Sequence, residues 1–120
     1  MQQIIDVLKT LRINPINEEY DLQAEIEKLF IDSEIRYERE YMLGPHNRVD
    51  FMTFKDCIAV EVKKGKPNKA GVIKQLLRYA EFDLVNGIIL VVEKNMDVPK
   101  TLNGKPCVSL GLNKLWGIAL

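Results

Sequence analysis

The sequence predicts one α/β domain in which a mixed β-sheet is flanked by α-helices. Helical and strand-like stretches alternate in the order ααβββαβ, followed by a β-rich C-terminal tail. A length of 120 residues suits a single domain. The apolar run GIILVV at 87–92 is typical of a strand that is covered on both faces.

Apolar residues at helical spacing predict three helices, over 2–12, 18–32 and 69–82. The first is expected to end at INPIN, because proline disfavours helix at the residue before it. Strands are predicted at 34–43, 48–54, 57–63, 87–92 and 106–110, and the last segment, 115–120, suits either a strand or a helix. The segment GPHN is a turn by composition.

Composition excludes several classes of protein. A net charge of zero argues against a simple polycationic nucleic-acid binder. No stretch approaches the roughly 18 apolar residues of a membrane span, so no membrane partner is expected. The N-terminus lacks the basic head and cleavage site of a signal peptide. Cys57 and Cys107 are too few for a disulfide framework, which favours buried thiols and a cytoplasmic location.

The middle hairpin brings charged residues into apolar strands. If 48–54 pairs antiparallel with 57–63 around Lys55-Asp56, opposed residue numbers sum to 111 and Asp50 faces Glu61. Opposed side chains share one sheet face. Strand alternation adds Lys63 to that face and places Val49, Phe51, Ile58, Val60 and Val62 on the other.

Two adjacent carboxylates repel each other, so their apposition predicts a divalent cation between them. Hard cations such as Mg²⁺ take oxygen ligands and keep several waters. The alternative is an Asp–Lys or Glu–Lys ion pair on an exposed face of the sheet.

A basic strip follows this hairpin, because residues 62–80 contain six bases and no acid. Such a strip can contact phosphate even in a chain of zero net charge, and a solvated helix face is the alternative. Its members are Lys63, Lys64, Lys66, Lys69, Lys74 and Arg78.

Asp50 followed by Glu61-Val62-Lys63 resembles the motif of the PD-(D/E)XK nuclease superfamily, with Val49 where the usual proline stands. QLLRY, from Gln75 to Tyr79, resembles the Q-x-x-x-Y element of the RecB-type branch. Glu25 falls where archaeal Holliday-junction resolvases carry a glutamate, and Glu27 is the alternative match. Within a single domain spanning 1–120, the nuclease-like core is expected at 18–93, with the helix 2–12 and the extension 94–120 outside it.

The resemblance implies a restriction-endonuclease-like fold and a metal-dependent deoxyribonuclease of the repair, recombination or restriction type. Mg²⁺ or Mn²⁺ would be held by Asp50, Glu61, the Val62 carbonyl and Glu25, and Lys63 would orient the attacking water. Gln75 and Tyr79 would position the lysine or the nucleic acid. DNA phosphates would be contacted by Lys64, Lys66, Lys69, Lys74, Arg78 and Arg48.

Two other functions fit the same residues. One is a catalytically inactive nucleic-acid-binding or assembly subunit that keeps the nuclease fold, and the other is a structural protein whose acids are paired with lysines. The apolar residues Ile4, Ile5, Leu8 and Leu11 lead us to expect a homodimer contact through the first helix. Packing of that helix on its own sheet is the alternative.

Overall fold

The computed structural model describes residues 1–12 and 19–113. Within them it has three helices and a six-stranded mixed sheet, which confirms the predicted α/β class and the order ααβββαβ. The helices are α1 (Gln2–Leu8), α2 (Glu19–Asp32) and α3 (Lys69–Ala80). The strands are β1 (Tyr37–Gly44), β2 (Asn47–Thr53), β3 (Ile58–Lys63), β4 (Gly87–Val92), β5 (Thr101–Leu102) and β6 (Lys105–Gly111).

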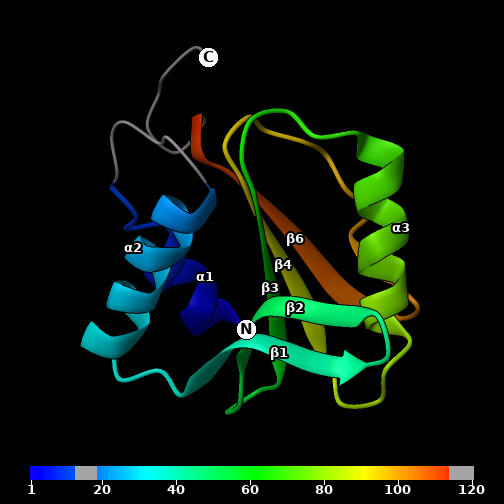
Figure 1. Ribbon diagram of the computed structural model, residues 1–120, viewed down its shortest axis with the longest axis horizontal. Coiled ribbons are helices and arrows are strands. Elements are labelled where there is room, and N and C mark those ends of the chain that lie inside the picture. The colour runs from blue at the N-terminus through cyan, green and yellow to red at the C-terminus, as the bar shows by residue number, and fades with distance from the viewer. Residues whose placement is uncertain (13–18, 114–120) are drawn as a thin grey trace.

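The sheet lies between two layers of helix. Its strand order is β1-β2-β3-β4-β6-β5, with β1, β2 and β3 antiparallel, β4 and β6 parallel to β3, and β5 antiparallel to β6. Helices α1 and α2 cover one face and α3 covers the other (Figure 1). All six residues of β4 are buried, as its unbroken apolar run predicts for a strand covered on both faces.

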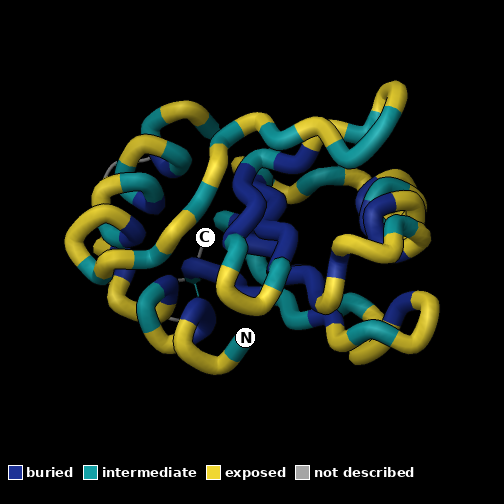
Figure 2. The backbone as a smooth tube through the Cα atoms, turned by 90° about the horizontal axis from the view of Figure 1, so that it is seen from below, coloured by how far each residue is buried: buried dark blue, intermediate teal, exposed yellow. Residues whose placement is uncertain are grey.

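Each face of the sheet has its own apolar cluster, and the two are packed by different helices. On the first face, Phe30 of α2 meets Phe51 of β2 in an edge-to-face contact with ring centroids 5.5 Å apart. On the second, α3 contributes Val72, Leu76 and Tyr79. The buried residues concentrate between the helices, whose outer surfaces are exposed (Figure 2).

The apolar residues of the N-terminal helix are buried within the chain. Ile4, Ile5, Leu8 and Leu11 are between 0% and 8% exposed and belong to the cluster that contains α2. The structure therefore has the alternative arrangement, packing on the chain's own core, and the apolar residues that motivated a homodimer contact are already covered. Helix α1 ends at Leu8, and the predicted stop at INPIN falls outside the described residues.

The predicted register of the middle hairpin is confirmed. Phe51 pairs with Val60, Met52 with Ala59 and Thr53 with Ile58, so opposed numbers sum to 111. The loop between the strands has four residues, 54–57, centred on the predicted Lys55-Asp56.

The prediction for Val49 is wrong, because it packs in the cluster beneath α3 while Phe51 packs on the α2 side. The neighbouring strand has the same break: Arg39 lies over Phe51, whereas Tyr41 packs on the α3 side. Glu40, between them, has a left-handed φ of 51°. Such a residue interrupts the two-residue repeat of an extended strand. The side chains of β1 therefore switch from one face of the sheet to the other at Glu40, and those of the paired strand β2 switch at the same level.

The C-terminal segment belongs to the sheet through β6, which pairs with β4. The strand predicted at 106–110 is confirmed, and the short β5 was missed. Asn103-Gly104 joins β5 to β6 with φ values of 51° and 75°, the left-handed pair that a tight hairpin turn requires. The segment 115–120 lies outside the described residues. Among the residues described, no helix has the length and apolar character to cross a membrane.

Candidate active site

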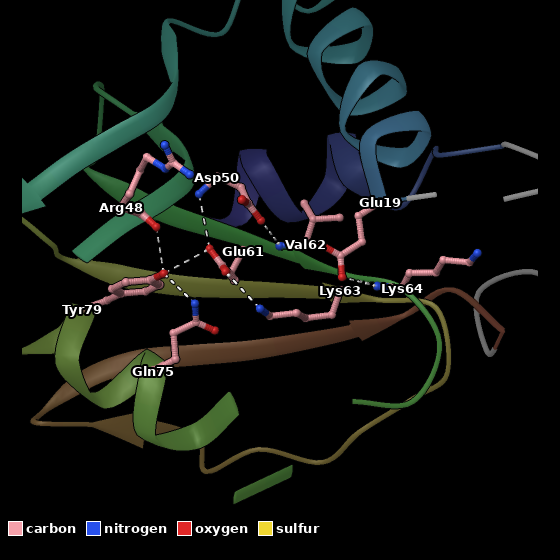
Figure 3. Close-up of polar contacts among 9 residues, drawn as sticks. All are labelled: Glu19, Arg48, Asp50, Glu61, Val62, Lys63, Lys64, Gln75 and Tyr79. Atoms are coloured by element: carbon pink, nitrogen blue, oxygen red, sulfur yellow. Dashed lines mark hydrogen bonds and ion pairs between the residues drawn. The ribbon is translucent and has the colours of Figure 1, made fainter. Parts of the chain in front are cut away.

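Asp50 and Glu61 meet where β2 and β3 stop pairing through their backbones. The backbone register ends at Phe51 and Val60, and side chains replace the next ladder bonds. The Val62 N–H donates to Asp50 Oδ2 at 2.7 Å, and the Asp50 N–H donates to Glu61 Oε1 at 3.2 Å (Figure 3). Each carboxylate therefore accepts a hydrogen bond from the opposite strand, which fixes both side chains next to each other.

The site disfavours ionisation of both acids. Glu61 is 4% exposed. Burial, and then the neighbouring Asp50 carboxylate, raise the pKa of Glu61 to about 7. Burial also raises the pKa of Asp50, against the hydrogen bond from Val62 and the charge of Lys63, which lower it. When both are ionised, the pair would carry more negative charge than its surroundings compensate.

Lys63 supplies one positive charge to this pair. Its Nζ lies 3.4 Å from Glu61 Oε2, and its side chain is 22% exposed, so the ammonium lies between the buried acids and solvent. The Lys63 carbonyl accepts a hydrogen bond from the Glu93 N–H at the end of β4, which fixes the strand on its other side. The alternation predicted for β3 therefore does bring Glu61 and Lys63 together.

The Val62 carbonyl lies on the β2 side of β3. In a strand the N–H and C=O of one residue point to the same side. The Val62 N–H points to Asp50, so its carbonyl leaves β3 on the side that faces β2. The structure therefore brings Asp50 and Glu61 together, and the Val62 carbonyl as a metal ligand stays a prediction.

Gln75 and Tyr79 lie one turn apart on α3, and Tyr79 contacts both Glu61 and β2. The Gln75 side-chain amide donates to the Tyr79 hydroxyl at 2.9 Å. That hydroxyl donates to the Arg48 carbonyl at 2.9 Å and lies 3.4 Å from Glu61 Oε1. Burial, with the nearby Glu61 and Asp50 charges, raises the pKa of Tyr79 well above its ordinary value, so the phenol remains a donor. These contacts reach Glu61 and not Lys63 itself, and the predicted role toward nucleic acid stays a prediction.

The acid of α2 that approaches the site is Glu19. Its Oε1 accepts the Lys64 N–H at 3.1 Å, and its charge contributes to the raised pKa of Asp50. Glu25 is half-buried and makes no hydrogen bond or ion pair with Asp50 or Glu61 among the described contacts. Glu25 lies six residues after Glu19, which is about 9 Å along the helix axis at 1.5 Å per residue. Glu27, the alternative match, instead pairs with Arg39 at 3.3 Å.

The residues present fit a magnesium site of two carboxylates and one carbonyl. Residues 1–12 and 19–113 contain no group of three or more His, Cys, Asp or Glu side chains that could hold a metal ion. Mg²⁺ is commonly bound through one or two carboxylates, with waters and substrate phosphate completing the shell. The unbalanced charge of Asp50 and Glu61 is the feature that a divalent cation would neutralise.

The basic strip predicted to contact phosphate is exposed, and its first part is held in place. The Gly65 N–H donates to a Glu93 carboxylate oxygen at 2.8 Å, which fixes the loop after β3. The Asn68 side chain caps α3 by accepting the Gly71 N–H. Arg78 donates to Asn47 Oδ1 at 3.2 Å, which joins α3 to the β1–β2 hairpin. The exposed basic residues are Lys64, Lys66, Lys69, Lys74, Arg78 and Arg48.

No protein-family model matches this sequence, and neither the curated proteins nor the solved structures provide a match. The geometry and charge of the site are therefore the basis for assigning a function.

Proposed function

We propose that this protein is a Mg²⁺-dependent deoxyribonuclease with a restriction-endonuclease-like fold. The observation that supports this most directly is the pair of adjacent carboxylates, Asp50 and Glu61, with Lys63 beside them. One lysine cannot neutralise two acids, so the arrangement is incomplete as an ion pair. It has the composition of a site for a cation and a phosphate.

Asp50, Glu61 and the Val62 carbonyl would hold the metal ion. When bound there, Mg²⁺ would lower the pKa of a bound water and neutralise negative charge on the phosphate. The backbone hydrogen bonds to the two carboxylates hold them in position before the ion arrives. Such preorganisation keeps the cost of assembling the site low.

Lys63 would orient the attacking water and stabilise negative charge that develops on the phosphate. A lysine ammonium is a compact charge with three donors, which suits both tasks. Tyr79 and Gln75 act one step further away, because Tyr79 contacts Glu61 and the backbone of β2, and Gln75 holds the Tyr79 hydroxyl. They are positioning residues for the acid.

DNA would lie against the exposed basic residues. Lys66 and Lys69 follow the end of β3, on which Glu61 and Lys63 lie. Arg48 is on β2, close to Asp50 in sequence, and its carbonyl is bound by Tyr79. Contacts of this kind hold the phosphate backbone without reading sequence.

A catalytically inactive DNA-binding or assembly subunit is the second candidate. One observation favours it, namely that the described residues contain two acids at the site and no third carboxylate able to complete a metal group. An inactive subunit would bind DNA without cleaving any, whereas the proposed enzyme cleaves in a metal-dependent way.

The test is a cleavage assay on linear, circular, single-stranded and branched DNA, and on RNA, with Mg²⁺, Mn²⁺ or EDTA. We expect metal-dependent DNA cleavage that Glu61→Gln abolishes. Glu38→Gln is the matched control, because Glu38 is an exposed acid on β1. Failure to cleave any DNA, with binding retained, would contradict the proposed enzyme and support the inactive subunit.

A further inference from the structure

Tyr20 presents an exposed aromatic ring beside the candidate active site. It is the second residue of α2 and is 65% exposed, the most exposed of the large apolar or aromatic side chains described. Its neighbour Glu19 accepts the Lys64 N–H, one residue after Lys63 (Figure 3). The start of α2 is therefore attached to the strand end that carries the site.

Arg39 holds this ring in place. Its guanidinium carbon lies 5.5 Å from the centroid of the Tyr20 ring and 5.6 Å from that of Phe51. The guanidinium donates to Gln23 Oε1 at 2.9 Å and to Glu27 Oε1 at 3.3 Å. A fixed cation over the ring restricts its motion, and the exposed part of the ring is accessible to a second planar group.

The connection from Tyr20 to the acids is short. Glu19, the residue before Tyr20, accepts the Lys64 N–H, and Lys64 follows Lys63 of the site. A group stacked on Tyr20 would therefore lie near the end of β3, at the rim of the site.

Resting on the proposed function, we propose that Tyr20 stacks on an unpaired nucleobase beside the phosphate that is cleaved. The preferred substrate would then be single-stranded DNA or a frayed or flapped end. Bases of an intact duplex stack on one another and offer only their edges, so they cannot use the face of an aromatic ring. An unpaired base offers its π-face, and a basic surface with an aromatic platform is how proteins hold single strands without reading sequence. Stacking also adds affinity that a chain of zero net charge cannot obtain from phosphate contacts alone.

Binding of a single-stranded oligonucleotide and of the matching blunt duplex, with Ca²⁺ in place of Mg²⁺, tests this proposal. Tyr20→Ala should weaken single-strand binding roughly 5- to 150-fold, the range of one lost base–aromatic stack. Tyr20→Phe should keep most of the affinity, and duplex binding should change little in either variant. Ile31→Ala is the matched control, because Ile31 is 60% exposed near the other end of the same helix.

An abasic nucleotide moved stepwise along the single strand locates the contact. At one position it should weaken wild-type binding as much as Tyr20→Ala does, and it should not weaken the variant further. Equal losses on single strand and duplex, or no loss, would overturn the role of Tyr20. If wild-type protein cleaves DNA but Tyr20→Ala binds and cleaves like it, only this inference fails. If no DNA is cleaved but single-strand binding depends on Tyr20, the nuclease fails and the stacking site stands.

Discussion

Replacing Glu61 with glutamine should stabilise the metal-free protein at neutral and alkaline pH. Burial and the Asp50 carboxylate raise the pKa of Glu61 from its ordinary 4.5 to about 7. A carboxyl with a higher pKa in the folded state binds its proton more tightly when folded. The proton on Glu61 therefore stabilises the folded state fully below pH 4.5, and this stabilisation is lost as the pH rises from 4.5 through 7. Glutamine keeps the shape and removes the ionisation.

The expected size follows from the two pKa values. At about 1.4 kcal/mol for each pH unit between 4.5 and about 7, ionising Glu61 in the folded protein costs about 3 kcal/mol. Asp50, whose pKa is raised as well, would add to the loss in the same direction. About 3 kcal/mol is a large part of the 5–15 kcal/mol that typically stabilises a domain.

Urea unfolding in EDTA at pH 5 and pH 8 measures this effect. We expect Glu61→Gln to be more stable than wild type by about 3 kcal/mol at pH 8, with most of the difference gone at pH 5. Glu38→Gln, an exposed acid, should follow wild type at both values. Adding Mg²⁺ at pH 8 should stabilise wild type and leave Glu61→Gln almost unchanged, because a ligand that binds only the folded state stabilises it. Identical pH dependence in wild type and Glu61→Gln would refute the reasoning.

Three other predictions concern the neighbouring residues. Lys63→Ala should abolish cleavage at saturating Mg²⁺ while calorimetric titration shows metal affinity largely unchanged; full activity would remove the lysine from the mechanism. Tyr79→Phe should lower the free energy of unfolding by about 1–3 kcal/mol, since it leaves buried polar partners unsatisfied, and Tyr41→Phe is the control in the same urea titration. Replacing three strip lysines with alanine should flatten the slope of log K against log salt by up to about 2.7 on duplex DNA, if all three contact phosphate. An unchanged slope would show that these lysines face solvent and do not contact phosphate. The lysines are Lys64, Lys66 and Lys69.

The parts of the fold that depend on local pattern could be predicted from the sequence. The register of β2 and β3 follows from two apolar strands and a short loop, and the structure has the predicted pairing. The side of the sheet on which Val49 packs could not be predicted, because strand alternation does not anticipate the irregular backbone at this level, where Glu40 of the paired strand has a left-handed φ. The Asn103-Gly104 dipeptide was a readable hairpin signal for β5 that was overlooked.

The candidate site also has one part that the sequence predicts and one part that depends on how the helices pack. Glu61 and Lys63 share a strand, so alternation places them together without knowledge of the rest of the fold. The acid from α2 depends on how that helix packs against the sheet, which sequence spacing does not reveal. The resemblance suggested Glu25, whereas the packing of α2 brings Glu19 to the end of β3. An acid in the first turn of a helix has a local stabilising role too, so Glu19 carried no distinctive signal.

The charge balance of the site argues against the purely structural alternative. Asp50 and Glu61 carry two negative charges when ionised, and Lys63 contributes one positive charge. The neighbouring Glu19 and Glu40 make the deficit larger, since both raise the pKa of Asp50. An ion pair retained only for stability would be improved by replacing either acid with an apolar residue of similar size, because burying charge is costly even when it is paired. When both acids are ionised, the arrangement lacks one more positive charge near the carboxylate oxygens, and under the proposed function a divalent cation would supply that charge and leave room for a phosphate.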